Sequence, residues 1–281
     1  MVTDVPYEVL DVFTTQRYAG NPLAVVKLTT EDISQAQKQQ IAKEFNLSET
    51  VFWHQYGDQT LGTRIDIFTP EAEIPFAGHP TIGSAVCVLE HLKQSSGTLL
   101  VKAGPIALTR PGDGYTYASI PHKSHTHAVQ PLKGAAVVSI VRGMTFTLVE
   151  MSSREELSAQ SKEIPLLREQ LDHEWQVGLT GTYYYYRDPN EDDSYRCRMF
   201  TSFDGSGLED AATGSAACTL AVHLADQNSS RKNMLIRIQQ GVEIGRPSEI
   251  LVKTERDGQG KIDTVVLGGR ATRLMQGTLL L

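Results

Sequence analysis

The sequence has few cysteines and no long apolar run. Its three cysteines, Cys87, Cys197 and Cys218, form no CxxC pair, so neither a disulfide framework nor a cysteine-rich zinc site is expected. A membrane-spanning helix needs about 18 consecutive apolar residues, and the chain has no such stretch. The first residues carry neither a basic start nor an apolar segment, so no secretory signal is expected. These absences predict a cytoplasmic protein with no membrane partner.

Basic residues are also in the minority. Lysine and arginine together number 26, against 33 aspartates and glutamates, and the net charge is -7. A nucleic-acid-binding protein would show a basic patch or a high isoelectric point, so no nucleic-acid partner is expected. The charge suits a protein that handles small molecules. The 281 residues are enough for one large domain or for two of roughly 140 residues.

Several well-known catalytic motifs are missing as well. The chain contains no Walker A loop, no GxGxxG turn after a strand, no HExxH motif and no GxSxG nucleophile elbow. These motifs hold phosphates, zinc or a nucleophilic serine in enzymes of those classes. The mechanisms that depend on them therefore find no support in this sequence.

Two stretches of the sequence match each other at a constant offset. Residues 79–89 read HPTIGSAVCVL, and residues 210–220 read DAATGSAACTL. The same register pairs His79 with Asp210. The chain is therefore interpreted as two copies of one unit, with a titratable residue at the same place in each copy.

The match between the copies extends to strand-like segments. Residues 64–69 and 196–201 read RIDIFT and RCRMFT, and both alternate in the manner of a strand. Many short strands with two helices in each half predict an α+β fold. We expect an N-terminal half over residues 1–122 and a C-terminal half over residues 123–281, whose last strand could pack on the first half.

The two matching segments predict buried helices. No Asp, Glu, Lys or Arg occurs over residues 80–88 or over residues 211–225. A helix that is apolar on all sides is a buried one, and the small residues of these segments let other backbones approach closely. We expect each helix to pass through the centre of a curled sheet.

Each expected helix begins beside a titratable residue. Pro80 suits a first helical turn, and Asp210 is a plausible N-cap. The N–H groups of helix starts bind anions, so one cleft between the halves would suit a carboxylate, with His79 and Asp210 on opposite sides. Taken singly, Asp210 is more simply a cap and His79 a core or turn histidine. Their equivalent places in the repeat favour a catalytic role.

Glu49 is the third candidate for catalysis. It lies between Leu47 and the apolar residues 51–53, and such surroundings raise a carboxyl pKa toward the range that a general acid or base needs. The alternative is an exposed strand glutamate, which the local pattern alone favours.

Three histidines, His122, His125 and His127, occur between the two copies. We interpret their segment, residues 121–127, as a solvated linker. No acidic residue or cysteine lies beside them in the sequence to complete a metal site, so no metal is predicted.

Several segments in order resemble the PhzF-like (phenazine biosynthesis-like) isomerase family. They are residues 11–14, 20–26, 47–52, 76–81 and 209–216, together with the terminal GGR and GTL of residues 268–279. The resemblance covers essentially the whole chain. It implies the diaminopimelate epimerase fold, in which two pseudo-equivalent domains each wrap a curved, mostly antiparallel sheet or barrel around a central buried helix. The active site of that fold lies between the domains.

The resemblance also implies roles for individual residues. Glu49 corresponds to the family's acid/base glutamate, and His79 and Asp210 correspond to its site histidine and aspartate. The substrate-contacting serines correspond to Ser48 and Ser215. Epimerases of this fold carry two cysteines at the helix starts, so His79 and Asp210 here argue against two-thiol chemistry. Ala211 departs from the family's usual proline.

The remaining implications concern ligands and assembly. Backbone N–H groups near Gly78 and at Gly214 and Ser215 would bind a substrate carboxylate. The family uses no metal and no organic cofactor, and its members are commonly homodimers.

Together these observations predict a cofactor-independent isomerase that moves a proton within a small carboxylate-bearing metabolite of a biosynthetic process. Two alternatives stay open. One is an amino-acid epimerase or racemase that uses Glu49 and a second group. The other is a non-catalytic protein that binds a small molecule on the same fold.

Overall fold

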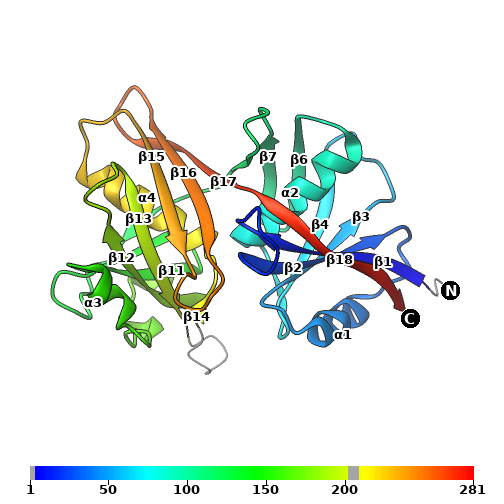
Figure 1. Cartoon of the computed structure of the whole chain (residues 1–281), viewed down its shortest axis with the longest axis horizontal. Helices are drawn as coiled ribbons and strands as arrows, with labels where there is room; N and C mark the ends of the chain where they lie inside the picture. Colours follow the sequence, from blue (N-terminus) through cyan, green and yellow to red (C-terminus); the bar gives the residue numbers. More distant parts are fainter. Residues whose placement is uncertain (1–3, 202–208) are drawn as a thin grey trace. The chain divides into compact units, whose positions relative to one another are not determined.

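A computed structural model describes residues 4–201 and 209–281 of the chain (Figure 1). Its internal contacts divide the chain into two compact units. Unit 1 comprises Met1–Ser119 with Gly268–Leu281, and unit 2 comprises Ile120–Leu267. No helix in these described ranges has the length and apolar character that a membrane crossing requires.

Unit 1 is a curved sheet around one helix. Its strands are β1 (Asp4–Val12), β2 (Asn21–Leu28), β3 (Thr50–His54), β4 (Thr63–Phe68), β5 (Glu73–Ile74), β6 (Ser96–Val101), β7 (Gly104–Thr109), β8 (Thr116–Ser119) and β18 (Ala271–Leu280). Its helices are α1 (Gln35–Phe45) and α2 (Gly78–Leu92). Pairing runs in the order β18-β1-β2-β3-β4-β6-β7-β8. Strands on both sides of this order, from β18 and β1 to β6 and β8, contact α2, so the sheet wraps around the helix.

Unit 2 repeats this plan. Its strands are β9 (His125–Thr126), β10 (Ala136–Val141), β11 (Met144–Glu150), β12 (Leu179–Arg187), β13 (Ser194–Phe200), β14 (Glu209–Asp210), β15 (Asn233–Gln240) and β16 (Ser248–Arg256), and β17 (Ile262–Gly269) leads back to unit 1. Its helices are α3 (Arg154–Ser158), the short 3-10 helices η1 (Arg168–Gln170) and η2 (His173–Trp175), and α4 (Gly214–Gln227). Helix α4 packs against β10, β11, β15 and β16.

The two units share one sequence of strand pairings. In unit 1, β1–β2 is antiparallel, β2–β3 parallel, β3–β4 antiparallel, β4–β6 parallel and β6–β7 antiparallel. In unit 2 the pairs β10–β11, β11–β12, β12–β13, β13–β15 and β15–β16 follow the same alternation. The predicted fold class, two pseudo-equivalent α+β units with a central buried helix, is confirmed.

The central helices are buried because they are uncharged and built of small residues. Every residue of α2 from Gly78 to Leu89 is buried, as is every residue of α4 from Gly214 to Val222. A Cβ atom on Gly83 would lie 2.5 Å from Leu23 Cδ2 and 2.9 Å from a methyl group of Val12. Helix α2 therefore approaches β1 and β2 closely because position 83 carries no side chain.

Two expectations from the sequence are wrong in detail. Residue Asp210 does not cap a helix: it lies in β14 and pairs with Met199 of β13, and α4 begins at Gly214 with Thr213 as its N-cap. Residues 121–127 are not simply a linker, because His125 and Thr126 form β9 and pair with β10. In both cases pairing with a distant strand overrides the preference of the local sequence.

A buried ionic cluster joins α1 to the sheet of unit 1. Lys38 Nζ lies 2.5 Å from Asp66 Oδ2, and His54 Nε2 lies 2.8 Å from the same oxygen. Burial by itself would raise the pKa of Asp66, but the hydrogen bonds from His54 and Lys38 outweigh it and hold that pKa far below its ordinary value. The cluster therefore keeps Asp66 ionised inside the protein.

We expect Asp66→Asn to lower the free energy of unfolding by about 3 kcal/mol, because it leaves the Lys38 ammonium buried without a counter-charge. The depressed pKa makes this contribution present above the unfolded carboxyl pKa of about 3.9 and absent once the pH falls through the folded value. Urea unfolding measures the full contribution at pH 7 and its partial loss near pH 3, which lies between the two pKa values.

Glu73→Gln is the matched control. Glu73 pairs with Lys102, whose side chain is 60% exposed, and such surface pairs contribute about 0–1 kcal/mol. Equal effects of the two substitutions at pH 7 would contradict the prediction.

Candidate active site

Unit 1 brings two of the sequence-predicted residues together. Glu49 precedes the first residue of β3, and His79 is the second residue of α2. His79 Nε2 lies 3.5 Å from Glu49 Oε2, with 5% and 17% of the two side chains exposed. Thirty positions apart in sequence, they meet because β3 lines the wall that encloses α2.

Asn21, the first residue of β2, sets the tautomer of His79. Its side-chain nitrogen lies 3.4 Å from His79 Nδ1. An amide N–H only donates, so Nδ1 accepts and a neutral ring carries its hydrogen on Nε2. The Nε2–H group therefore faces the carboxyl group of Glu49.

The carboxyl group of Glu49 is poised to titrate near neutral pH. Burial raises its pKa to about 7, although a hydrogen bond from Ser48 acts in the opposite direction. Among the described residues, none makes a hydrogen bond to the buried Oε2 atom. A carboxyl group with a pKa near the working pH can both accept and donate a proton.

The start of α2 lies beside this pair. Its N-cap residue, Ala77, makes no side-chain hydrogen bond to the helix, and Gly78 adds no side chain there. The backbone N–H groups of a first helical turn and the helix dipole attract anions. This end of α2 therefore places N–H groups of its first turn next to Glu49 and His79.

Asp210 lies in unit 2, at the end of β14, and hydrogen bonds join it to the segment that leads into α4. Its Oδ2 atom accepts a hydrogen bond of 2.6 Å from Thr213 Oγ1. The fully buried Gln240 donates to the backbone oxygen of Asp210 at 2.9 Å and to Thr213 Oγ1 at 3.0 Å. Gln240 in turn accepts from Tyr183 Oη at 3.0 Å. The side-chain amide of Gln240 therefore fixes the segment that leads into α4.

Gly214 and Ser215 open α4 directly after this segment. Both are buried, and the Ser215 carbonyl accepts a hydrogen bond of 2.8 Å from Thr219 Oγ1. Unit 1 thus assembles Ser48, Glu49 and His79 with Gly78, and unit 2 assembles Asp210 with Gly214 and Ser215.

Sequence reasoning missed Asn21 and Gln240. Asn21 stands within residues 20–26, one of the segments that carry the family resemblance, but without an assigned role. Gln240 ends a strand in which Met234, Ile236 and Ile238 are the buried alternate positions. A glutamine in register with inward-facing apolar residues was the available signal for a buried polar contact.

Thiol chemistry finds no support at the helix starts. All three cysteines are buried, and burial raises the pKa of the Cys87 thiol to about 12. A thiol with such a pKa stays protonated and unreactive at neutral pH. Within the described ranges, the one group of side chains close enough to hold a metal ion is His125, His127 and Asp172, which includes none of the residues above.

Comparison with known proteins agrees with the fold. The family model named phenazine biosynthesis-like protein matches residues 10–277. The chain belongs to this family. The trans-2,3-dihydro-3-hydroxyanthranilate isomerase of Pseudomonas aeruginosa is 32% identical over 289 residues, which cover 96% of this chain and 98% of that protein. The predicted family is confirmed, and the protein is a PhzF-like small-molecule isomerase.

Solved structures show the same fold for this PhzF-like protein. A phenazine biosynthesis protein of the PhzF family from Bacillus anthracis superimposes with a TM-score of 0.79 over 100% of both chains at 17% identity. A hydroxyproline epimerase from Agrobacterium vitis superimposes with a TM-score of 0.71 over 99% of this chain and 93% of the other at 10% identity. At these identities the likeness concerns the fold alone.

We expect Glu49→Gln to stabilise the PhzF-like protein increasingly as the pH rises. The unfolded carboxyl group loses its proton near pH 4.3, whereas burial moves the folded pKa to about 7. Wild-type stability therefore declines between these values and stays reduced above them, and glutamine removes the effect. From pH 5 to pH 8 the stability difference between variant and wild type should grow by roughly 2.5 kcal/mol.

Urea unfolding at both pH values measures this difference. The matched control is Glu44→Gln, which changes an exposed glutamate of α1. The same difference at pH 5 and pH 8 for Glu49→Gln would mean that the carboxyl group is not buried as described.

Proposed function

We propose that the protein catalyses a proton shift within a small carboxylate-bearing metabolite, without a metal or organic cofactor. The observation that carries this proposal is the buried carboxyl group of Glu49, with a pKa of about 7 and its Oε2 atom 3.5 Å from His79 Nε2. Few carboxyl groups titrate at this pH, and those that do are suited to acid/base catalysis.

In the proposed reaction Glu49 removes a proton from an activated carbon of the substrate. The C–H electron pair moves into the adjacent conjugated system and shifts a double bond. Glu49, now protonated, returns the proton to a different carbon. One residue can serve both steps because its pKa lies near neutrality, so neither protonation state is strongly disfavoured.

His79 supports this cycle as a hydrogen-bond donor. The contact from Asn21 leaves the hydrogen of the neutral ring on Nε2, where it can stabilise the ionised form of Glu49 or hold a hydroxyl group of the substrate. The N–H groups of the first turn of α2, at Gly78, would bind the substrate carboxylate.

Asp210, Gly214 and Ser215 are proposed to bind the same substrate. The carboxylate of Asp210 would accept a hydrogen bond from an amine or hydroxyl group, and the N–H groups of Gly214 and Ser215 would donate to a carboxylate. Ser48 would contact the substrate in addition to its hydrogen bond with Glu49. Support comes from the family resemblance and from the fixed loop that Gln240 and Thr213 build around Asp210.

The proposed function also includes where the protein works and how it assembles. We infer a homodimer that serves a biosynthetic process, as the family resemblance implies, and a cytoplasmic location, as the three sparse cysteines indicate. Size-exclusion chromatography with light scattering measures the number of chains in the assembly. Activity after dialysis against a chelator tests whether catalysis needs a metal ion, and we expect the activity to survive.

An epimerase is the competing function, since an epimerase of another substrate shares the fold. Incubation in D₂O separates the possibilities, with trans-2,3-dihydro-3-hydroxyanthranilate, the substrate of the Pseudomonas aeruginosa relative, as the first compound. Deuterium at carbon with a moved double bond means isomerase, and deuterium with inverted configuration means epimerase. Binding without exchange means a non-catalytic binding protein.

We expect Glu49→Gln to lower kcat by about 10² or more, as loss of a general base implies, with little change in KM. In the wild type, kcat/KM should rise with pH through about 7, because the ionised form of Glu49 starts the cycle. Steady-state kinetics between pH 5 and 9 measure both effects, with Glu44→Gln as the control. A wild-type kcat in Glu49→Gln would place the proton transfer on another group.

We expect Asp210→Asn to raise KM and lower kcat, each by about tenfold, since hydrogen bonds to charged groups contribute roughly 1.5–3 kcal/mol. Asparagine can still accept the hydrogen bond from Thr213, so the loop keeps its shape. His79→Ala should weaken binding and turnover in the same way. Unchanged kinetics of Asp210→Asn would remove Asp210 from the proposed site.

A further inference from the structure

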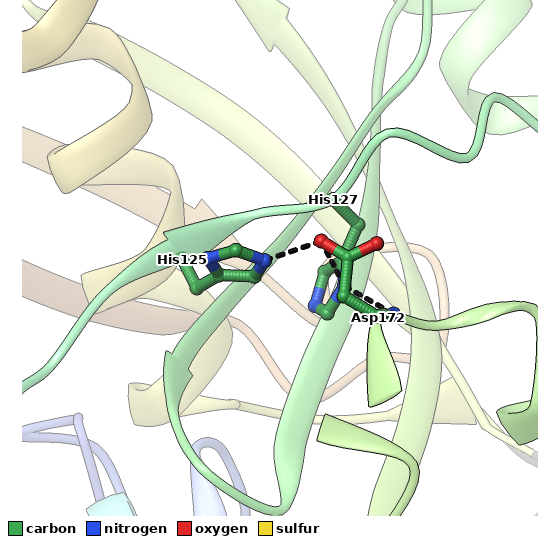
Figure 2. Close-up of side chains that lie close together, drawn as sticks. All are labelled: His125, His127 and Asp172. Atoms are coloured by element: carbon green, nitrogen blue, oxygen red, sulfur yellow. Dashed lines mark hydrogen bonds and ion pairs between the residues drawn. The ribbon is translucent and has the colours of Figure 1, made fainter. Parts of the chain in front are cut away.

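Unit 2 contains a second cluster of titratable side chains that the proposed reaction does not use. His125 lies in β9, His127 follows it, and Asp172 immediately precedes η2. Figure 2 shows the three side chains converging. One donor atom from each lies within 4.8 Å of the others. His125 Nε2 is 2.5 Å and His127 Nδ1 is 3.8 Å from Asp172 Oδ2.

The hydrogen bonds of His127 place its unprotonated nitrogen on the side of this cluster. The backbone N–H of Asp172 donates to His127 Nδ1 at 3.3 Å, so Nδ1 is the unprotonated nitrogen. Nε2 then carries the hydrogen and donates to Ser139 Oγ at 2.9 Å, which contacts Thr145 Oγ1 at 2.6 Å. A histidine whose far nitrogen is held by such a partner has the fixed orientation that metal-binding histidines show.

A metal ion at His127 Nδ1 would replace the long hydrogen bond of 3.3 Å from the Asp172 backbone N–H. The side chain of His127 is fully buried, and burial together with the neighbouring His125 lowers its pKa. Neutral imidazole is the form that binds metals. His127 Nδ1 and Asp172 Oδ2 lie 3.8 Å apart, and a cation between them would bind to both.

The distances suit a small divalent ion. Zinc bonds to nitrogen and oxygen of about 2.0–2.2 Å in a tetrahedral arrangement place ligand atoms roughly 3.3 Å apart. The distances to Asp172 Oδ2, 2.5 Å from His125 and 3.8 Å from His127, lie on either side of this value. The side chains of His125 and Asp172 are 34% and 43% exposed, so they can adjust by less than 1 Å, and solvent can supply a fourth ligand.

We propose that His125, His127 and Asp172 bind one divalent transition-metal ion, with zinc as the ion best suited to two imidazoles and a carboxylate. On binding, the metal replaces the hydrogen at His125 Nε2, which leaves to solvent or moves to Nδ1 of the same ring. The ion would link β9, through His125, to the segment before η2, through Asp172. Its role is structural, since none of these residues takes part in the proposed proton shift.

The test uses the full chain without an affinity tag. Equilibrium dialysis against Zn²⁺ with metal analysis should give one ion per chain, and Zn²⁺ should raise the Tm. His125→Ala and Asp172→Asn change partly exposed side chains, and each should weaken Zn²⁺ binding at least tenfold and remove the rise in Tm. His173→Ala, an exposed histidine next to Asp172 but outside the cluster, should change neither.

Trp175 supplies an independent signal. Its ring stacks on His125 with centroids 4.8 Å apart and planes 9° from parallel, and the only other tryptophan is Trp53. In a Trp53→Phe background, Ni²⁺ should quench the remaining fluorescence in the parent chain but not after Asp172→Asn. The proposal is overturned if the parent chain binds no Zn²⁺, or if His125→Ala and Asp172→Asn bind it as tightly as the parent.

Discussion

Burial of an uncharged helix inside a curved sheet is the constraint on which the rest of each unit depends. Helix α2 can lie against β1 and β2 because Gly83 leaves room for Leu23 and Val12. Once the helix is enclosed, its first turn is fixed as well. His79 is thereby placed beside the residue that precedes β3, and water is largely kept from both. The same packing that stabilises unit 1 therefore creates its candidate catalytic pair.

The effect of burial on a carboxyl group depends on its partners. Glu49 lies just before β3 and Asp66 lies within the neighbouring β4, and burial alone would raise the pKa of both. Asp66 receives hydrogen bonds from Lys38 and His54 and stays ionised. Glu49 receives one from Ser48, which is too little to offset burial, so its pKa rises to about 7. Asp66 therefore serves structure, whereas Glu49 is available for proton transfer.

The two units keep one topology but differ in local chemistry. His79 lies inside the first turn of α2, whereas its sequence partner Asp210 lies in β14, four positions before α4 begins. Gln240 accounts for the difference, because it bonds to the backbone of Asp210 and to the side chain of Thr213. Strand pairing and helix burial conserve the architecture, while a few buried polar groups decide where each titratable side chain stands.

The sequence by itself determined the architecture and most of the candidate residues. The repeat of residues 79–89 in residues 210–220 predicted two equivalent units. The lack of charge in these segments predicted the buried helices, because a buried helix is apolar on all sides and its local composition shows this. The resemblance to the PhzF-like family singled out Glu49. Only the tertiary structure decided which side chains meet. The contacts of Glu49 with His79, of Gln240 with Asp210 and of His125 with Asp172 join strands and loops far apart in the chain, and strand register, which no local window of sequence contains, sets such contacts.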